Sequence, residues 1–589
     1  MSNNSKHDES RAFIGRCIDQ ALGRVEADLV IRNTRFLDVI TGELVAGDIA
    51  ICGDRIVGTC ESYQGREEID GSEITVVPGF IDTHVHCESS LVTPLEFDRC
   101  VLPKGTTTAI CDPHEIANVL GAEGIRYFFD CARQTCLDLR VQLSSCVPAT
   151  HLETAGAQLD AEALVALRDD PSVIGLAEFM NYPGLLAKAP DVLDKLAAFD
   201  GWHIDGHAPM VRGRDLNAYL ACGICNCHET TSADEAREKL RKGMNVLIRE
   251  GTVSKDLAEL APLLNAHTSQ AMGFCTDDRN PLDIAEEGHL DFLIRKAIAL
   301  GIAPDDAYRA ATWSAARAFG LRDRGMIAPG KRADLVLLSD YGQCEIHSVI
   351  SAGRRVNAAL FQQRELVDPV GLNSIKRLPV TTADFRVPAI QGDMPVIGVR
   401  AGSIITDNRP LALKISRDSL GDVHTSDMEQ DILKICVLER HGVNGDIGRG
   451  FVQGFDLQRG ALASSVGHDS HNICVVGCND QDMALAVNHL IEIGGGFAIA
   501  VDGDIQTALP LPIAGLVSLE PYEVVRRQLE TLRDAVRKLG CQLPEPFLQL
   551  AFLPLPVIPH LKITDQGLVD VDTFSIVQLE ALSSTDSGG

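Results

Sequence analysis

The sequence is short of positive charge. Its 589 residues include 53 lysines and arginines against 82 aspartates and glutamates, a formal net charge of −29. Such a chain repels nucleic-acid phosphates and anionic membrane surfaces, so we expect neither as a partner. It also lacks an apolar run of membrane-spanning length, and its first residues, MSNNSKHDES, lack the basic and apolar regions of a secretory signal. We therefore expect a cytoplasmic protein.

The 18 cysteines do not indicate a disulfide framework. They are scattered over a long chain that shows no secretory signal, which favours reduced and mostly buried thiols. The apolar share of 45% and the charged share of 23% are typical of a globular protein. A chain of 589 residues exceeds one ordinary core, so two or three domains are predicted.

The central part of the chain, residues 79–322, is predicted to form a (β/α)8 barrel of the TIM type. Eight short apolar or β-branched runs occur there, each followed by a helical stretch, and this alternation specifies parallel strands. Its length is close to the roughly 250 residues that are typical of such barrels. The eight runs are IDTHVH, GTTTAICDPHE, RVQLSSCVPATH, SVIGLAEFM, WHIDGHAP, GICNCHE, NVLIREGT and AMGFCTDD.

Strand-rich segments flank the predicted barrel on both sides. A short helix is expected over residues 11–20, and apolar and polar residues then alternate between turn signals up to residue 78. Residues 323–392 have the same character. We therefore predict one β-sandwich domain built from residues 1–78 and 323–392, which makes the whole an α/β protein.

The remaining residues, 393–589, are predicted to form a separate α+β domain. DMEQDILKICVLER and DMALAVNHLIEI have helical periodicity, and three glycines cap the second before the strand FAIAV. The motif HDSH, residues 468–471, has no further ligand nearby in the sequence. We interpret it as a polar turn, with a place in the lining of the catalytic mouth as the alternative.

Polar side chains gather at the C-terminal ends of the predicted barrel strands. Barrel enzymes carry their chemistry at that rim, and histidine or carboxylate at nearly every strand end is not expected of solvated loops. His84 and His86 lie two residues apart on one strand, so both side chains point to the same side and can converge on one metal ion. The rim residues are His84, His86, Asp112, His114, Glu115, His151, Glu178, His207, His228, Glu229, Arg249, Glu250, Asp277 and Asp278.

Some of these residues form the ligand set that a two-metal hydrolase needs. The histidines of the first strand and the aspartate of the eighth can hold one ion, the histidines of the fifth and sixth strands can hold the other, and the glutamate of the fourth can bridge them. Two ions about 3.5–4 Å apart can share a hydroxide, because bound metal lowers the pKa of water towards ~7. The expected ligands are His84, His86, Glu178, His207, His228 and Asp277.

A rival metal site is conceivable in ACGICNCHE. Cys222, Cys225, Cys227 and His228 have spacings that a structural zinc could use. A strand with alternating faces cannot aim all four at one ion, and a second pair of ligands is usual. We favour small apolar packing for the cysteines.

Several polar residues beside the ligands are candidates to contact a substrate. His114 and Glu115 follow the second strand, with a capped turn as their structural alternative. Glu88 and Ser89 lie just past the two histidines, where a substrate must enter. Arg249 either faces the pocket or forms a salt bridge at the rim.

These motifs resemble the amidohydrolase superfamily, whose members carry HxH on strand 1, a carboxylated lysine or a glutamate on strand 4, histidines on strands 5 and 6, and aspartate on strand 8. Glu178 stands where many members carry the lysine, so the bridging ligand needs no carbon dioxide. Over nearly the whole chain, the sequence looks like the bacterial adenine deaminases. The segments that carry this likeness are PGFIDTHVHCESS, CDPHEIANV, GLAEFMNYPG, DGHAP, CHE, TDDR and ASSVGHDSHNICVVGCNDQDMALAVN.

The resemblance implies an adenine aminohydrolase, a hydrolase of C–N bonds in cyclic amidines that serves purine salvage or catabolism. It implies two divalent ions, and a mixed nitrogen and oxygen set does not choose among manganese, iron and zinc. In the expected mechanism a metal-bridged hydroxide attacks C6 of adenine and Asp277 relays its proton to the departing amine, giving hypoxanthine and ammonia. His228 stabilises the intermediate, and a nearby glutamate with a raised pKa protonates N1. Glu88 and Glu229 are both near enough, and the sequence does not say which of them acts.

Two alternatives stay open at this point. A related amidohydrolase that cleaves a cyclic amide would use the same ligands, and a barrel without catalysis could serve as an interaction scaffold. Degenerate barrels usually lack ligands, whereas this sequence has the full set. We expect adenine as the small-molecule partner and a homo-oligomer, taken as a dimer.

Overall fold

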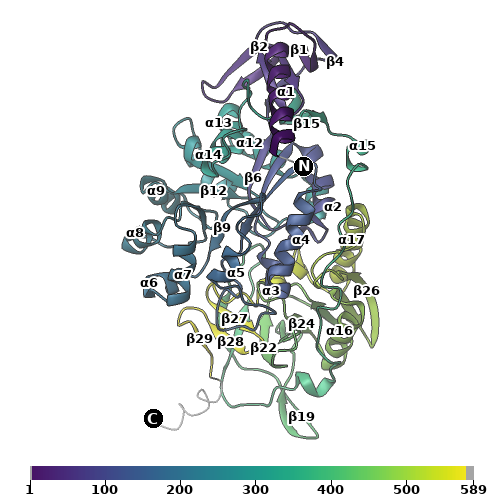
Figure 1. Ribbon diagram of the computed structural model, residues 1–589. Coiled ribbons are helices and arrows are strands. Elements are labelled where there is room, and N and C mark those ends of the chain that lie inside the picture. Colours follow the sequence, from purple (N-terminus) through teal and green to yellow (C-terminus); the bar gives the residue numbers. More distant parts are fainter. Residues whose placement is uncertain (1–2, 579–589) are drawn as a thin grey trace.

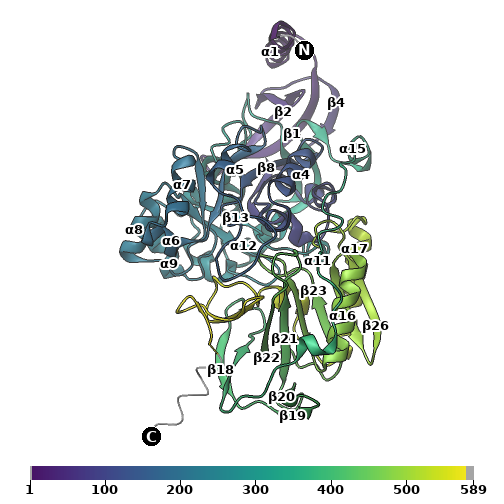
Figure 2. The ribbon, with the colours of Figure 1, turned by 60° about the horizontal axis from the view of Figure 1, so that its bottom comes forward.

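The computed structural model describes residues 3–578, which form three parts stacked along the long axis of the molecule. The N-terminal β-rich part lies at one end, the barrel in the middle and the C-terminal part at the other end (Figure 1, Figure 2). Within the described range, no helix has the length and apolar character that crossing a bilayer requires.

Eight parallel strands form the barrel. They are β6 (Phe80–Val85), β7 (Thr106–Cys111), β8 (Asp138–Leu143), β9 (Val173–Phe179), β10 (His203–Gly206), β11 (Asn226–Cys227), β12 (Asn245–Arg249) and β13 (Met272–Cys275). Five pair in the order β6 to β10 and three in the order β11 to β13. Backbone hydrogen bonds close the ring: Cys225 donates to Ile204 between β10 and β11, and Asp277 bonds with His84 and His86 between β13 and β6. The predicted barrel and all of its predicted strands are confirmed.

Helices follow every strand and cover the outside of the barrel (Figure 1). They are α2 (Pro94–Val101), α3 (His114–Leu120), α4 (Ala122–Ala132), α5 (Ala161–Val165), α6 (Tyr182–Ala187), α7 (Pro190–Ala198), α8 (Gly213–Ala221), α9 (Ala233–Arg241), α10 (Leu257–Leu260), α11 (Pro281–Glu286), α12 (Leu290–Ala299), α13 (Pro304–Arg309) and α14 (Ala315–Ala318). Because helices cover them, the strands are buried on both faces, which explains their nearly continuous apolar runs.

Buried hydrogen bonds hold β6 against β13 below the rim. Asp82 accepts from the N–H and the hydroxyl of Thr276 at 3.1 and 2.6 Å, and Thr83 donates to the carbonyl of Phe274 at 2.7 Å. An unpaired buried polar group would cost about 1–3 kcal/mol. These bonds therefore fix the register of the two strands that present the histidine pair and the aspartate.

The strands on either side of the barrel pair with one another. They are β1 (Ala27–Asp38), β2 (Glu43–Cys52), β3 (Arg55–Thr59), β4 (Gly65–Asp70), β5 (Thr75–Pro78), β14 (Leu335–Asp340), β15 (Glu345–Ser351) and β16 (Arg354–Arg355). One eight-stranded sheet results, in which β14 from the second flank lies antiparallel to β5 from the first. The composite β-structure predicted from both flanks is thus one continuous sheet. Helix α1 (Asn3–Ala21) is longer than predicted, and α15 (Ala358–Phe361) follows β16.

The C-terminal part is built on a second eight-stranded sheet of order β18-β17-β22-β21-β24-β23-β25-β26. Its strands are β17 (Met394–Gly398), β18 (Asp407–Leu411), β21 (Ile432–Leu438), β22 (Ile447–Gln453), β23 (Ala461–Ser464), β24 (Ile473–Gly477), β25 (Gly496–Val501) and β26 (Asp504–Pro510). Further elements are β19 (Ile415–Asp418), β20 (Gly421–His424), α16 (Asp480–Ile493), α17 (Tyr522–Lys538), α18 (Pro546–Ala551), β27 (Leu561–Thr564), β28 (Gly567–Asp570) and β29 (Ser575–Ile576).

One of the two helix predictions for this part is wrong. The segment DMEQDILKICVLER contains β21, a central strand whose seven residues are all buried. A short strand buried on both faces shows no alternation, so periodicity cannot separate it from a buried helix. The other prediction is confirmed: α16 ends at Gly494, which caps it in the left-handed conformation, with φ at 81°, before β25.

Lys562, on β27, ties together two segments that reach the mouth of the barrel. Its Nζ donates to the carbonyl of Ile404 at 2.7 Å and to that of Phe552 at 3.0 Å. Both partners are neutral, and burial lowers the pKa of Lys562 from 10.5 to about 7.

We predict that Lys562→Met weakens the pH dependence of stability between pH 7 and pH 10.5. In this window the unfolded chain protonates Lys562 more than the folded chain does, so the lysine lets stability rise with pH. Thermal melts at both ends of the window measure the effect. The melting temperature of the wild type should rise relative to that of the variant as the pH rises, whereas the exposed-site control Lys538→Met should follow the wild type. Parallel curves for wild type and Lys562→Met would contradict the prediction.

Candidate metal centre

The structure brings all of the predicted metal ligands together at the C-terminal rim of the barrel. The first pair ends β6, the glutamate lies in β9, and the others follow β10, β11 and β13. None is more than 6% exposed. Closure of the barrel explains this convergence, because the carboxyl ends of parallel strands meet at one rim. The predicted ligands are His84, His86, Glu178, His207, His228 and Asp277.

One half of the cluster surrounds the two histidines of β6. Their Nε2 atoms face each other at 3.1 Å. Asp277 Oδ1 lies 3.5 Å from His84 Nε2 and 3.1 Å from His86 Nε2. Glu178 Oε1 lies 3.6 and 3.4 Å from the same two nitrogens. Ligand atoms about 3.3 Å apart are what tetrahedral bonds of ~2.0–2.1 Å require, so these donors have the spacing of a cation site.

The other half is arranged around the second oxygen of Glu178. Its Oε2 lies 2.5 Å from Nδ1 of His207 and 3.2 Å from Nε2 of His228. Glu178 thus places one oxygen in each half of the cluster, as a bridging carboxylate does.

The electrostatics of the cluster also fit cations. Burial lowers the pKa of His84, but Asp205, Asp277 and Glu178 outweigh it and raise that pKa to about 10. The pKa of His86 is likewise well above its usual value, despite burial and the neighbouring His114, because Asp277 and Glu178 face it. The carboxylates therefore attract positive charge to this point, and a divalent ion would have to displace these protons.

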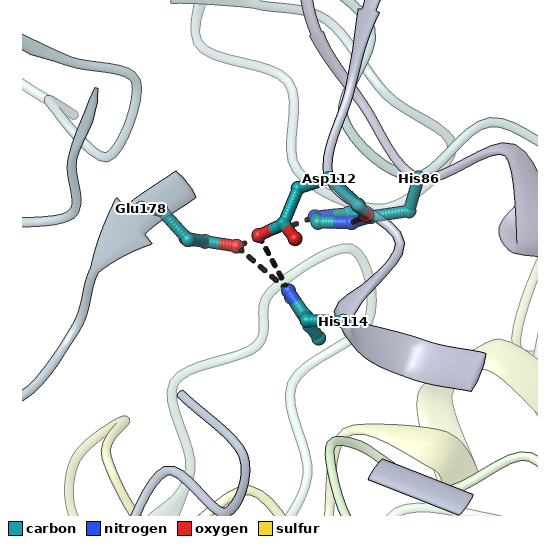
Figure 3. Close-up of side chains that lie close together, drawn as sticks. All are labelled: His86, Asp112, His114 and Glu178. Atoms are coloured by element: carbon teal, nitrogen blue, oxygen red, sulfur yellow. Dashed lines mark hydrogen bonds and ion pairs between the residues drawn. The ribbon is translucent and has the colours of Figure 1, made fainter. Parts of the chain in front are cut away.

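A further pair of polar side chains adjoins the cluster (Figure 3). His114 Nδ1 lies 2.9 Å from Asp112 Oδ2 and 3.3 Å from Glu178 Oε1, while His86 Nδ1 lies 2.9 Å from the carbonyl of Asp112. Asp112, His114, His86 and Glu178 also satisfy the spacing of a metal group. Asp112 therefore orients two histidines, a role that its position at a strand end did not reveal.

Arg249 crosses the cavity side of the cluster. It is 2% exposed and donates to Glu229, to Asp277 Oδ2 at 3.0 Å and to Asp256 Oδ2 at 3.1 Å. The sequence predicts that Arg249 either faces the pocket or forms a salt bridge. In the structure it does both. Burial would raise the pKa of Glu229, but Arg249 and His207 lower it on balance.

Glu88 and Ser89 lie behind the wall of the cavity. Glu88 Oε1 accepts from the N–H of Ile116 at 3.2 Å, and Ser89 donates to Asp278, which does line the cavity. Burial, together with the charge of Glu115, raises the pKa of Glu88 to about 8. The two properties expected of the N1 acid are thus divided: Glu88 has the raised pKa, and Glu229 has the position.

A cavity opens directly above the cluster, and both the barrel and the C-terminal part line it. The barrel contributes His86, His114, Glu115, Glu178, Met180, His207, His228, Glu229, Arg249, Asp277 and Asp278. The C-terminal part contributes Ile404, His468, Asp469, Phe552, Leu555 and Ile558. HDSH does form a turn, over residues 468–470, and His468 and Asp469 also have the alternative place in the lining of the cavity. The motif's partner Glu115 is 356 residues away in the chain, so no local pattern could reveal the contact.

The cysteines of ACGICNCHE contact other partners. Cys225 Sγ lies 3.4 Å from His203 Nδ1, and Cys227 Sγ accepts from Lys239 Nζ at 3.3 Å. His228 instead faces Glu178. These contacts support packing by the cysteines over a zinc knuckle.

Comparison with known proteins covers nearly the whole chain. The family model "Amidohydrolase family" matches residues 75–356, and the model "Adenine deaminase C-terminal domain" matches residues 403–575. A curated relative from Sinorhizobium fredii, called adenine deaminase, is 62% identical over 95% of this chain and 99% of its own length. One of the same name from Brucella anthropi is 60% identical over 96% of this chain and all of its own length. A solved N-acetylglucosamine-6-phosphate deacetylase from Mycobacterium smegmatis, 18% identical, aligns with 56% of this chain and 100% of its own at a TM-score of 0.43.

We predict that Glu178→Gln weakens binding of divalent metal by about tenfold or more, because changes even outside the ligand shell cost 10–100-fold. The amide removes the charge that both halves of the cluster share. Metal per chain, measured by mass spectrometry after dialysis, reports the loss. Glu153→Gln is a matched control, because burial and Asp469 raise the pKa of Glu153 to about 8 and an amide resembles its protonated form. Equal metal content in both variants would rule out the bridging position of Glu178.

Proposed function

The chain belongs to the adenine deaminases of the amidohydrolase family, and on that premise we propose that it hydrolyses adenine to hypoxanthine and ammonia. The observation that carries the proposal is a buried carboxylate, Glu178, that lies among four histidines beneath a cavity enclosed by two parts of the chain. A cyclic-amide hydrolase would use the same ligands, and the match of residues 403–575 favours deamination.

The predicted ligands suit two divalent ions, for which manganese, iron and zinc are the candidates. His84, His86 and Asp277 would hold one ion, and His207 and His228 the other, with Glu178 between them. A bound divalent ion supplies hydroxide near neutral pH, because it lowers the pKa of a coordinated water.

Asp277 is placed to move the proton of the attacking water. Its Oδ1 faces the histidines of β6, while Arg249 holds its Oδ2 at 3.0 Å. Since Oδ1 would hold the ion, Oδ2 is the oxygen left to accept the proton and pass it to the departing amine, and Arg249 keeps that oxygen oriented. This is general acid–base transfer by a positioned carboxylate.

Glu229 and His228 serve the other side of the reacting carbon. Purine N1 gains a proton as C6 becomes tetrahedral, and Glu229 lines the cavity 4.0 Å from His228 Nε2. Arg249 keeps Glu229 ionised at rest, so Glu229 would first take up the second proton of the attacking water and then deliver that proton to N1. His228 would stabilise the negative charge that develops on the oxygen at C6.

The setting of the enzyme is part of the same proposal. We infer a cytoplasmic homo-oligomer, taken as a dimer, that has neither nucleic acid nor membrane as a partner, in keeping with the net charge of −29. A role in purine salvage or catabolism follows from the substrate.

The proposal is tested by ammonia release from adenine. Protein purified with manganese is assayed on adenine. One control is the same protein stripped of metal by a chelator, and the other is the metal-loaded protein with a dihydropyrimidine as the substrate. We expect hypoxanthine and ammonia only with metal and adenine. Metal-dependent ring opening of the dihydropyrimidine, with adenine unchanged, would favour the cyclic-amide alternative instead.

We predict that Asp277→Asn lowers kcat for adenine by about 10²- to 10⁴-fold, because the amide cannot accept the proton. The amide oxygen can still occupy the ligand position, so metal per chain should stay close to that of the wild type. Steady-state kinetics and mass spectrometry on the same preparation check both statements. Near-normal turnover would exclude Asp277 as the proton carrier.

A further inference from the structure

His468 belongs to the C-terminal part and lines the cavity of the barrel. Its ring is 3% exposed and stacks on Phe552, with centroids 4.5 Å apart and planes 9° apart. Its Nδ1 lies 2.8 Å from Glu115 Oε1. Its Nε2 is buried and has no hydrogen-bond partner within residues 3–578. A buried polar atom of this kind on a cavity wall is available to a ligand.

The loop that carries His468 is held from several directions. Arg440 donates to the carbonyl of His471, and Ser470 donates to Glu153 Oε2 at 2.7 Å. His471 bonds Glu115 through Nε2 and accepts from the N–H of Gly467 at 3.2 Å through Nδ1. All of these groups are buried, and the bonds of Ser470 with Glu153 and of His471 with Glu115 join the C-terminal part to the barrel. His468 is therefore fixed in place before any substrate enters.

The shape of a purine relates this position to the metal centre. C6 is flanked by N1 on one side and by N7, beyond C5, on the other. Glu229 follows β11, whereas Glu115, which holds His468, follows β7. The two strands lie four positions apart in a ring of eight, so they face each other across the barrel with the ligands between them. A purine whose C6 meets the metal centre and whose N1 meets Glu229 therefore turns N7 towards His468.

We propose that His468 is a substrate-contacting residue whose Nε2–H donates a hydrogen bond to N7 of the purine. The inference rests on the proposed function and extends it to a binding contact that the C-terminal part supplies. In this arrangement Nδ1 faces Glu115 Oε1, 2.8 Å away, which carries the compensating charge, and Phe552 keeps the imidazole in its plane. Burial opposes protonation of His468, but Glu115 and Asp278 raise its pKa well above the usual value, in keeping with donation from both nitrogens.

The test compares adenine with 7-deazaadenine, in which C–H replaces N7. A hydrogen bond to a charged group contributes about 1.5–3 kcal/mol, so the wild type should prefer adenine by about tenfold to a hundredfold in kcat/KM. His468→Phe keeps a ring on Phe552 but removes both nitrogens, so the preference should disappear. His441→Phe is the matched control, because His441 contacts the same loop at the carbonyl of Ser470, 2.7 Å away, and does not belong to the cavity wall. It should keep the preference.

Two further variants separate contact with substrate from support of Glu115. His468→Asn can replace Nδ1 beside Glu115 but does not reach the cavity, whereas His468→Gln extends an amide to the position of Nε2. We expect the preference for adenine to survive in the glutamine variant and to be lost in the asparagine variant. The same order should appear in calorimetric binding of hypoxanthine against 7-deazahypoxanthine, which does not depend on turnover.

The outcomes test the inference about His468 separately from the proposed deamination of adenine. The inference is overturned if wild type and His468→Phe prefer adenine equally. It is also overturned if the preference for adenine survives in His468→Asn but is lost in His468→Gln. If the phenylalanine variant does not fold, the asparagine and glutamine pair alone decides, and equal behaviour of that pair overturns the inference. Failure of the wild type to release ammonia from adenine overturns the proposed function, and it is observed before any variant is compared.

Discussion

The buried carboxylate of Glu178 is the group on which the rest of the site depends. A carboxylate 2% exposed would be neutral without compensation, yet the imidazoles of His207 and His228 hold its pKa well below the usual value against the effect of burial. Each of its oxygens serves one half of the ligand cluster. His207 and His228 therefore have two effects. They keep the carboxylate of Glu178 ionised, and they place imidazole nitrogens next to it, where an ion would bind.

This balance needs a closed barrel with strands fixed in register. The backbone of Asp277 is strained: its φ is 55°, a conformation that residues other than glycine rarely adopt. Backbone hydrogen bonds with His84 and His86 hold it there, so the closure of the ring is also what positions the aspartate. Strain at a functional residue persists only when the surrounding structure determines it fully.

Local patterns in the sequence are enough to predict the barrel strands and which histidines and carboxylates gather at the rim, because strand ends and HxH spacing are properties of neighbouring residues. They are not enough for contacts between distant segments. The sequence predicts Glu88 at the substrate entrance, but its carboxylate accepts a hydrogen bond from the N–H of Ile116. The pairing of Glu115 with His471 joins residues 356 apart, which no periodicity records. The sequence predicts a helix where β21 lies, because burial on both faces removes the alternation that marks a strand.

The composite cavity also has a consequence in time. A ribosome makes the chain from the N-terminus, so the last ligand, Asp277, is synthesised well before His468 and Phe552. Every barrel residue that lines the cavity is therefore synthesised before any residue of its outer wall. The pocket can be enclosed only after the C-terminal part has been made as far as Ile558.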